Sequence, residues 1–392
     1  MMEGWRTIRL GDACNTNVDS YSPKEKWPFV NYLDTGNITD NRIDAVQHID
    51  VKHEKLPSRA RRKVRRNSII YSTVRPNQRH FGIIKKQPDN FLVSTGFAVI
   101  DTDEEVLDAD FLYYLLAQST VVEKLHAIAE QSTSVYPSIK PSDIEDLEIC
   151  IPDIEIQKQI AEILSSLDRK VEQNSEINKN LFQQSLLLFE HEYVACCTSS
   201  EEMPLYDFAE YINGSAFKPN ELGDVGLPVI KIAELKSGIT DSTKYFNGDK
   251  DKKYLVANGD ILFSWSGNPE TSIDIFIWAD GNGILNQHTF NVRSKYGCPW
   301  FTYLLLKYYK PLFTKIASNK QTTGLGHVTA GDLKRLTFPF NLEQMQQIEK
   351  LVSPFMSLYY DNLVGNQRLR NLRDSLLPKL MSGEIEVSDI NL

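Results

Sequence analysis

The chain has 392 residues, of which 41% are apolar and 24% charged, and its formal net charge at pH 7 is −9. This length and composition predict two or three domains with sizeable cores and exclude a disordered chain, a collagen and a disulfide knot. No run approaches the ~18 uncharged apolar residues of a membrane helix, and the opening segment lacks the apolar core of a secretion signal. Five cysteines without C-x-x-C spacing predict neither a disulfide framework nor a zinc site, so we expect a cytoplasmic protein.

A strongly basic stretch interrupts this acidic composition. Between Lys52 and Lys86 the sequence has twelve basic residues and one acidic residue, so its local charge is about +11. The basic residues are Lys52, Lys55, Arg59, Arg61, Arg62, Lys63, Arg65, Arg66, Arg75, Arg79, Lys85 and Lys86. A field of this size indicates a surface for phosphate groups, although a solvated basic loop would have the same composition. Within this stretch Arg61, Arg62 and Lys63 are candidate contacts to a nucleic acid.

The sequence repeats itself at an offset near 190 residues. The matching segments are 66–72 with 258–264, 111–116 with 301–306, 131–133 with 321–323, and 185–187 with 375–377. A repeat of half the chain length predicts one ancestral unit used twice. In each half, short alternating runs rich in β-branched and aromatic residues, which are typical of strands and turns, precede a long helical pattern.

The helical pattern of the first half runs from Ile156 to Tyr193 without glycine or proline, and its apolar residues recur at near-heptad spacing. The second pattern contains Pro354, which should kink this helix or mark a late start. Each helix has a single apolar stripe, so each is the simplest packing partner of the other, and chain order makes the pair antiparallel. Some 28 to 30 paired residues would form a spacer of roughly 45 Å, about one turn of B-DNA.

These patterns predict an α+β fold with a pseudo-twofold internal repeat. We expect two globular domains, residues 1–152 and 198–340, joined by two long antiparallel helices that form a coiled-coil spacer. The first helix should occupy residues 153–197, and the second helix with the C-terminal tail residues 341–392.

The sequence lacks a convincing catalytic motif. It has no P-loop, no H-E-x-x-H and no metal-binding C-x-x-C spacing. Asp224, Glu234 and Lys236 loosely match the acidic and lysine residues of a metal-dependent nuclease, which stays an alternative. His288 and His327 have no evident serine or cysteine partner for a triad, so we interpret them as hydrogen-bonding loop residues. The chain is therefore expected to bind rather than to catalyse.

A polar segment after the predicted strand 66–72 has the side chains of a base-edge reader. Arginine suits guanine, asparagine and glutamine suit adenine, and serine or threonine can contact bases or phosphates. Pro76 should restrict the loop and lower the cost of ordering it. The candidates are Ser72, Thr73, Arg75, Asn77, Gln78, Arg79 and His80.

The corresponding segment of the second half is neutral, so the two halves should read different sequences. We interpret Tyr71 and Trp265 as core strand residues rather than stacking platforms. Glu270 and Asp274 would be unfavourable near phosphates, so part of this segment should point away from DNA. The remaining candidates are polar loop residues from both halves: Ser132, Thr133, Lys218, Ser266, Asn268, Gln287, His288, Thr322, Thr323 and His327.

Several strings together resemble the specificity (S) subunit of type I restriction–modification systems. They are SIIYSTVRPN, GDILFSWSGN, ILNQH, IKPSDIEDLEICIP, EIQKQIAEILSSLD, TTGLGHVTAGDLKRL and RDSLLPKLMSGEIEV, and the resemblance covers essentially the whole chain. It implies that each globular domain is a target-recognition domain for one half of a split double-stranded DNA site. It also implies that the helices set the gap between the half-sites and dock two methyltransferase (M) subunits.

The same resemblance implies that the catalytic groups lie in partner subunits. The M subunits would bind S-adenosylmethionine and methylate adenine, and restriction (R) subunits would use ATP and Mg²⁺ to translocate and cleave DNA. This chain would then hold no cofactor, no metal and no catalytic residue. Two alternatives stay open beside this expectation: the nuclease named above, and a helical adaptor with protein-binding ends.

Overall fold

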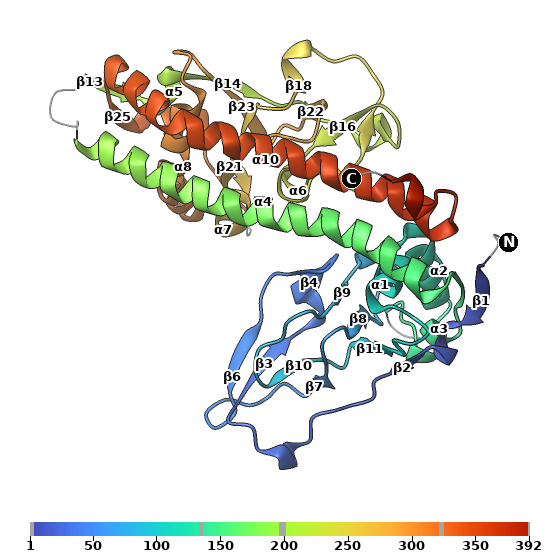
Figure 1. Ribbon diagram of the computed structural model, residues 1–392. Coiled ribbons are helices and arrows are strands. Elements are labelled where there is room, and N and C mark those ends of the chain that lie inside the picture. The colour runs from blue at the N-terminus through green and yellow to red at the C-terminus, as the bar shows by residue number, and fades with distance from the viewer. Residues whose placement is uncertain (1–3, 133–135, 196–200, 321–324, 391–392) are drawn as a thin grey trace. The chain divides into compact units, whose positions relative to one another are not determined.

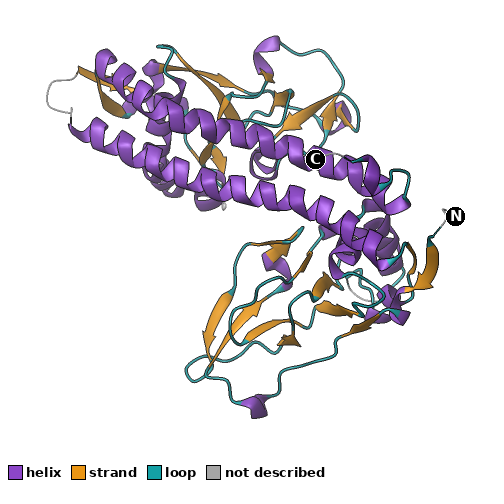
Figure 2. Cartoon of the chain, in the orientation of Figure 1, coloured by secondary structure: helices purple, strands orange, loops and turns teal. Residues whose placement is uncertain are grey.

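Two long helices organise the chain: α4 (Ile154–Ala195) has 42 residues and α10 (Leu342–Ser382) has 41 (Figure 1). The computed structural model describes residues 4–132, 136–195, 201–320 and 325–390. The chain forms two units, residues 1–169 with 371–392 (unit 1) and residues 170–370 (unit 2), so each long helix contributes one segment to each unit. The prediction of two long helices and a mixed α+β fold is confirmed (Figure 2).

The globular part of unit 1 contains two four-stranded sheets, with the strand orders β6-β3-β10-β7 and β2-β11-β8-β9. Strands β3 and β10 are parallel, and the other neighbouring pairs are antiparallel. All four residues of β10 are buried, since Phe91 and Val93 face one apolar cluster and Leu92 faces another. The strands of unit 1 are β1 (Arg6–Arg9), β2 (Cys14–Thr16), β3 (Phe29–Leu33), β4 (Ile38–Thr39), β5 (Arg42–Ile43), β6 (Gln47–Asp50), β7 (Ala60–Lys63), β8 (Ile69–Ser72), β9 (Phe81–Ile83), β10 (Phe91–Ser94), β11 (Phe97–Thr102) and β12 (Glu148–Ile151).

Three shorter helices complete unit 1: α1 (Ala109–Ala117), α2 (Ser119–Glu130) and α3 (Pro141–Glu145). The Asp108 side chain accepts a hydrogen bond from Phe111 N and so begins α1. Eight of the nine residues of α1 are buried, because this helix lies in the largest apolar cluster of unit 1. The first segment of α4 and the last segment of α10 contribute Leu164 and Leu380 to that cluster.

Unit 2 repeats the architecture of unit 1. Its sheets have the strand orders β14-β23-β19-β21 and β15-β17-β16-β22-β18, and β16 and β22 are parallel in the way that β3 and β10 are. Its strands are β13 (Glu201–Pro204), β14 (Ala209–Asn213), β15 (Leu222–Gly223), β16 (Leu227–Ile230), β17 (Tyr245–Phe246), β18 (Leu255–Val256), β19 (Ile261–Ser264), β20 (Ser266–Gly267), β21 (Asp274–Ile277), β22 (Gly283–Leu285), β23 (Thr289–Ser294), β24 (Gly326–His327) and β25 (Thr337–Phe340). Its helices are α5 (Leu205–Phe208), α6 (Ile232–Ser237), α7 (Pro269–Ser272), α8 (Pro299–Asn319) and α9 (Ala330–Arg335).

The predicted internal repeat is confirmed strand by strand. The β1–β12 pair corresponds to β13–β25, the central strand β8 to β19, and the strand β11 beside it to β23. Helix α3 corresponds to α9, and in each the side chain of the third residue caps the helix start: Asp143 accepts from Lys140 N, and Asp332 from Thr329 N.

The long helices are antiparallel in each unit, as predicted. In unit 1 the Arg373 guanidinium lies 2.6 Å from an Asp168 carboxylate oxygen, and in unit 2 Asn174 of α4 meets Asn366 of α10. Their apolar faces do not form the expected continuous seam. Leu164, Ile348 and similar residues pack into the cores of the globular parts. Ile177, Leu358 and Leu372, which belong to the apolar stripes of these helices, are 39–48% exposed. The sheets and shorter helices offer more apolar surface than the other long helix alone.

Four asparagines, of which Asn174, Asn178 and Asn366 are buried, join α4 and α10 in unit 2. Asn174 Nδ2 donates to Asn366 Oδ1 over 2.8 Å, and Asn362 Nδ2 donates to Asn178 Oδ1 over 2.9 Å. Asn178 Nδ2 in turn donates to the carbonyl oxygen of Tyr359 over 2.9 Å. Polar pairs buried between helices favour one register, because any shift leaves their amides without partners.

Pro354 does not end or delay the second helix. Helix α10 begins at Leu342, twelve residues earlier, so the expectation of a late start is wrong. A proline inside a helix costs about 3 kcal/mol because it removes one hydrogen bond and crowds the preceding turn. Met345, Ile348 and Val352 are all buried in the core of unit 2, and this packing holds the first turns helical despite Pro354.

Candidate nucleic-acid interface

The basic stretch of unit 1 carries less free charge than its sequence suggests. Four of its cations pair with carboxylates from outside the stretch: Lys63 with Glu25 and Asp19, Arg65 with Asp101, Arg79 with Asp40, and Lys85 with Asp110. The expected local charge of about +11 is therefore wrong as a measure of the surface field, since distant acids fold against these cations. Arg61 and Arg62 lie half-buried on β7, and the Nε atom of Arg62 is buried without a hydrogen-bond partner.

The segment after β8 begins with residues that hold its backbone. The Ser72 side chain is buried, and its hydroxyl donates to the carbonyl oxygen of Val74 over 2.9 Å. Both the amide and the hydroxyl of Thr73 donate to the carbonyl oxygen of Gly96. These two predicted site residues shape the loop, and their hydroxyls already have partners within the unit.

Arg75 lies at the exposed tip of this segment. Its φ of 49° puts the residue in the left-handed region, and its amide donates to the carbonyl oxygen of Pro137 over 2.9 Å. The guanidinium carbon lies 5.0 Å from the ring centroid of Tyr136, which is 56% exposed, in a cation–π contact. A β-bridge between Val74 and Ser138 attaches this tip to the segment that follows the predicted polar loop of Ser132 and Thr133. The structure thus brings these two loops together.

The second loop contributes Ser132, whose hydroxyl oxygen accepts from the amide of Ser138 at 3.3 Å. Thr133 lies outside the described residues, as do Thr322 and Thr323 of the second half. In the first loop, Asn77 and Gln78 are exposed in a short 3-10 turn, Pro76–Gln78, whose proline is buried. Pro76 fixes this turn, as the sequence predicts.

Arg79 and His80, in contrast, are bound into unit 1. Arg79 Nε lies 2.6 Å from an Asp40 oxygen, and its terminal nitrogen donates to the carbonyl oxygen of Ala117 over 2.9 Å. His80 Nδ1 lies 2.6 Å from the carbonyl oxygen of Ile38 and therefore donates to it. These contacts give both side chains a role in holding the start of β9.

In unit 2 the segment after β19 corresponds to the segment after β8, and it forms around Trp265. We call these two surfaces, around Arg75 in unit 1 and around Trp265 in unit 2, the edges of the units. The β20–β24 pair places Ser266 opposite His327, and the Trp265 amide donates to the carbonyl oxygen of His288. The indole nitrogen donates to Asn213 Oδ1 over 3.0 Å, and its ring lies 5.8 Å from that of His288. Trp265 is half-buried at this edge, so its assignment to the core is only partly right. Tyr71 is fully buried and stacked on Phe81, as expected of a core residue.

Other predicted residues gather at the same edge of unit 2. Gln287 and His288 are exposed, and their side-chain nitrogens lie 3.3 Å apart. The loop that leads to exposed Lys218 runs beside them, since the Ser215 amide donates to the carbonyl oxygen of Leu285. Asn268 caps α7 by accepting hydrogen bonds from the amides of Glu270 and Thr271.

The two edges share one backbone arrangement. Thr73 and Trp265 occupy equivalent positions: the amide of each donates to the turn before β11 or β23, and the carbonyl oxygen of each accepts from Ile139 or Val328. The residue two places later has a positive φ in both units, 49° at Arg75 and 121° at Gly267. The same hydrogen bonds therefore present different side chains in each unit.

This equivalence identifies residues that the sequence comparison missed. The turn Thr95–Gly96 of unit 1 corresponds to Gln287–His288 of unit 2, because each follows the strand that pairs in parallel with β3 or β16. Tyr136, which contacts Arg75, and Asn213, which holds Trp265, were also missed. Their segments share no motif between the halves, so only the strand register could reveal them.

The nuclease alternative has no assembled site. Asp224 is exposed and pairs with Lys244 over 3.0 Å, whereas the buried Glu234 accepts from the amide of Lys231 and begins α6. Among the described residues, no three histidine, cysteine or acidic side chains lie close enough to hold a metal ion. Within the same residues, no helix combines the length and apolar character needed to cross a membrane.

The geometry defines a protein of two similar units with matching polar edges, joined through two shared helices. Comparison with known proteins agrees. The family model described as type I restriction modification DNA specificity domain matches the chain twice, at residues 2–183 and 199–360. The chain belongs to this family of DNA-recognition subunits, whose systems place catalysis in other subunits.

Individual relatives are similar to different extents. The chain is 30% identical to the HindI specificity subunit of Haemophilus influenzae over 194 residues, which are 49% of this chain and 41% of that protein. It is 23% identical to the MjaIX specificity subunit of Methanocaldococcus jannaschii over 97% of this chain and 93% of that one. The crystal structure of a type I S subunit from M. genitalium has the same fold, with a TM-score of 0.55 at 17% identity over 96% of each chain.

Proposed function

We propose that this chain reads a bipartite DNA site, with one half-site for each target-recognition domain, residues 1–152 and 198–340. The observation that carries the proposal is the shared backbone arrangement of the two edges, which present Arg75 and Tyr136 in one unit and Trp265, Ser266 and His288 in the other. Two half-sites of different sequence require the same backbone arrangement in each unit with different side chains on it.

In unit 1 the proposed base reader is Arg75. Its guanidinium rests on the Tyr136 ring while the rest of the side chain is exposed, so it is oriented before it meets the guanine O6 and N7 atoms. Asn77 and Gln78 are exposed beside it and suit adenine. Arg61, Arg62 and Ser132 would contact the phosphate backbone, whereas Lys63, Ser72, Thr73, Arg79 and His80 would support the loop.

In unit 2 the proposed readers are Ser266, Gln287, His288 and His327, which surround Trp265 at the exposed edge. Lys218 and Asn268 flank this group, and the lysine would contact a phosphate group. Neutral donors and acceptors dominate here, so this half-site should contribute less than unit 1 to the salt dependence of binding.

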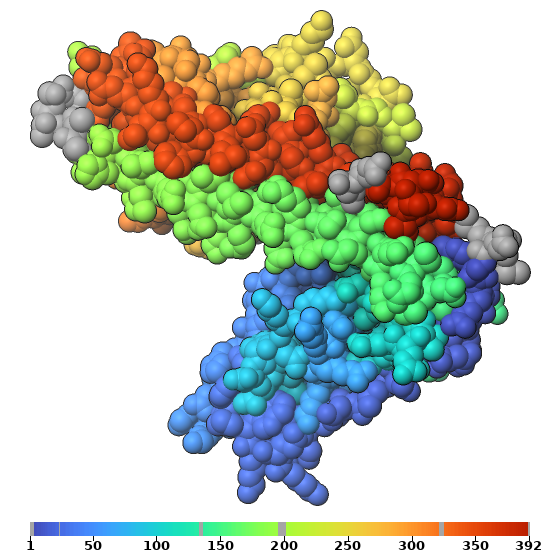
Figure 3. Space-filling view, in the orientation of Figure 1, coloured from blue at the N-terminus to red at the C-terminus, as the bar shows by residue number. Residues whose placement is uncertain are grey.

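The partners follow from the family. We propose that two M subunits, which bind S-adenosylmethionine, dock on α4 and α10, that R subunits with ATP and Mg²⁺ join them, and that the complex acts in the cytoplasm. Exposed apolar side chains on the helix segments of unit 2 support docking: Leu187 is 66% exposed, Val194 59%, Leu351 40% and Leu358 48%. Leu351 and Leu358 are one heptad apart and so lie on one face of α10. Figure 3 shows that the side of α10 turned to the viewer is uncovered.

The test is to map methylated adenines in DNA exposed to the chain and its neighbouring methyltransferase. Arg75→Ala should lower discrimination at one base of one half-site by about 1–3 kcal/mol, roughly 5- to 150-fold, and leave the other half-site unchanged. The matched control is Arg66→Ala, which removes another exposed arginine of unit 1 away from the edge. Unchanged discrimination in Arg75→Ala would show that Arg75 does not read a base.

A further inference from the structure

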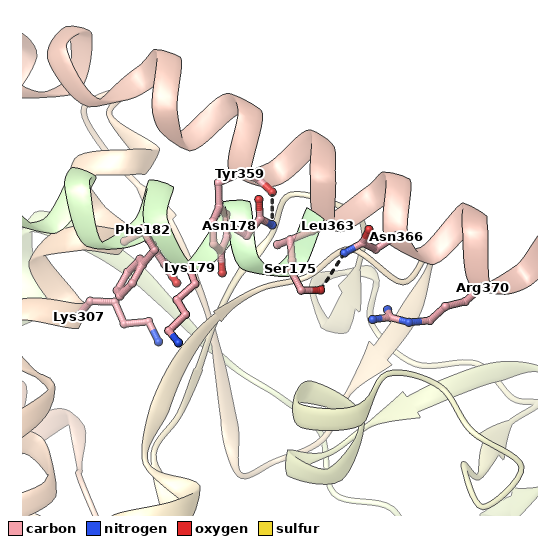
Figure 4. Close-up of a pocket in the computed structure, with 10 residues that line it drawn as sticks. Ser175, Asn178, Lys179, Phe182, Lys307, Tyr359, Leu363, Asn366 and Arg370 are labelled. Atoms are coloured by element: carbon pink, nitrogen blue, oxygen red, sulfur yellow. Dashed lines mark hydrogen bonds between the residues drawn. The ribbon is translucent and has the colours of Figure 1, made fainter. Parts of the chain in front are cut away.

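A cavity of about 320 Å³ lies in unit 2, lined by residues of α4, α8 and α10 (Figure 4). Ten side chains line it, of which Lys179, Lys307 and Arg370 are cationic and none is acidic. This volume is within the range of ligand pockets, about 300–1,000 Å³. Neither the base-reading edge of unit 2 nor the exposed leucines of the helices contribute to its lining.

The lysine on α8 belongs to a cluster with surplus positive charge. Lys307 Nζ and Lys310 Nζ each lie 2.6 Å from a different oxygen of Asp274, so two ammonium groups share one carboxylate. The Lys307 side chain is only 15% exposed, and the rings of Phe182, Phe276 and Tyr303 surround its ammonium group at 5.6–5.8 Å. A buried charge is costly unless it is balanced, so an anion in the cavity would stabilise this cluster.

Cations of the two long helices reach the same cavity. Lys179 and Lys307 point toward one another's ammonium groups in Figure 4, and the Arg370 guanidinium lies at the other end of the lining. In the part of the chain that the structure describes, no carboxylate lies within ion-pair distance of Lys179. Two ammonium groups, one from α4 and one from α8, thus converge at one end of a space with no acidic lining.

The repeat shows that the fold does not require this charge. Residues 301–306 of α8 match residues 111–116 of α1, so the position of Lys307 corresponds to Ala117 in unit 1. An alanine there is compatible with the same packing of sheet and helix. The lysine cluster is therefore a feature of unit 2 alone.

We propose that this cavity binds a phosphoryl group through Lys179 and Lys307. Ammonium donors form short charge-assisted hydrogen bonds with phosphate oxygens, and the rings of Phe182 and Tyr303 shield Lys307 from water. The group has two possible sources of the same chemistry: the backbone of a bound duplex, or a free nucleotide. The first source rests on the proposed function, and the second does not.

The experiment uses the full chain with its M subunits and three variants. Lys179→Gln removes the charge without breaking an ion pair, and Lys179→Arg should rescue it. Lys170→Gln is the matched control, because Lys170 is an exposed lysine of the same helix that does not line the cavity. The probes are inorganic phosphate and ATP by calorimetry, and a duplex lacking both half-sites by fluorescence anisotropy across a salt series.

Lys179→Gln should weaken binding of one probe class at least tenfold, or reduce the salt slope for duplex binding by about one, while Lys170→Gln leaves both unchanged. A change with phosphate and ATP identifies a free nucleotide, and a change with duplex alone identifies the backbone. Equal behaviour of Lys179→Gln and Lys170→Gln with all three probes would overturn the proposal. None of these readouts depends on base discrimination, so failure of the proposed base readers is measured separately.

Discussion

Replacing one asparagine of the pair Asn174–Asn366, which joins α4 and α10, should lower the free energy of unfolding more than replacing both. In Asn366→Leu the buried Asn174 amide loses the acceptor that lies 2.8 Å from its nitrogen, and an unpaired buried polar group costs about 1–3 kcal/mol. Asn174→Leu leaves the Asn366 oxygen without that donor and should cost a similar amount. The double variant removes both polar groups and buries two leucines, so its free energy of unfolding should lie within about 1 kcal/mol of the parent.

Urea unfolding followed by circular dichroism measures all four proteins of this cycle. The two single losses sum to about 2–6 kcal/mol and the double variant should lose at most about 1, so we expect a coupling energy of at least about 1 kcal/mol between Asn174 and Asn366. Asn180→Leu is the control, since this exposed asparagine of α4 should change stability by less than about 0.5 kcal/mol. If the double variant lost the sum of the two single losses, the pair would not act as a unit, and the reasoning from its hydrogen bonds would be refuted.

Two further predictions concern acid stability and the proline of α10. Burial raises the pKa of Asp332, but hydrogen bonds from Lys320, Thr329 and Arg335 outweigh it and hold this pKa below its usual value. Its contribution to stability is present above about pH 4 and lost as the pH falls further, so Asp332→Asn should flatten the melting temperature between about pH 4 and 2. Pro354→Ala restores a helical hydrogen bond at an exposed position and should raise the urea midpoint by the equivalent of about 1–3 kcal/mol. An unchanged midpoint would mean that α10 already accommodates the proline ring without cost.

The sequence predicted the architecture well because periodicity and repetition depend on local spacing. Both long helices and the duplication are confirmed, because helical periodicity and matched sequence segments do not depend on which elements pack together. The packing partners of the helices were harder to predict. Ile177 and Leu358 fit the heptad pattern, yet both are exposed because the globular cores take the inner faces of the helices.

The charge and the individual site residues were predicted less well, because both depend on contacts between distant segments. Asp40 and Asp110 neutralise arginine and lysine residues that lie 39 and 25 positions away in the chain. Ser72, Arg79 and His80 have the right chemistry for reading bases but donate their hydrogen bonds within unit 1. Tyr136 and Asn213 carry no motif, and their relevance appears only when strand register places them beside Arg75 and Trp265.

The backbone at the tip of each edge limits which residues evolution can place there. Arg75 and Gly267 both have a positive φ, which β-branched side chains avoid. Glycine, asparagine and aspartate best tolerate the left-handed conformation of Arg75, and only glycine readily adopts the φ of 121° at Gly267. Gain of a new target sequence at this one position is therefore restricted to a narrow set of side chains. Neighbouring positions with ordinary dihedral angles, such as Asn77 and Gln287, are open to almost any replacement, and diversification among descendants of this chain should concentrate there.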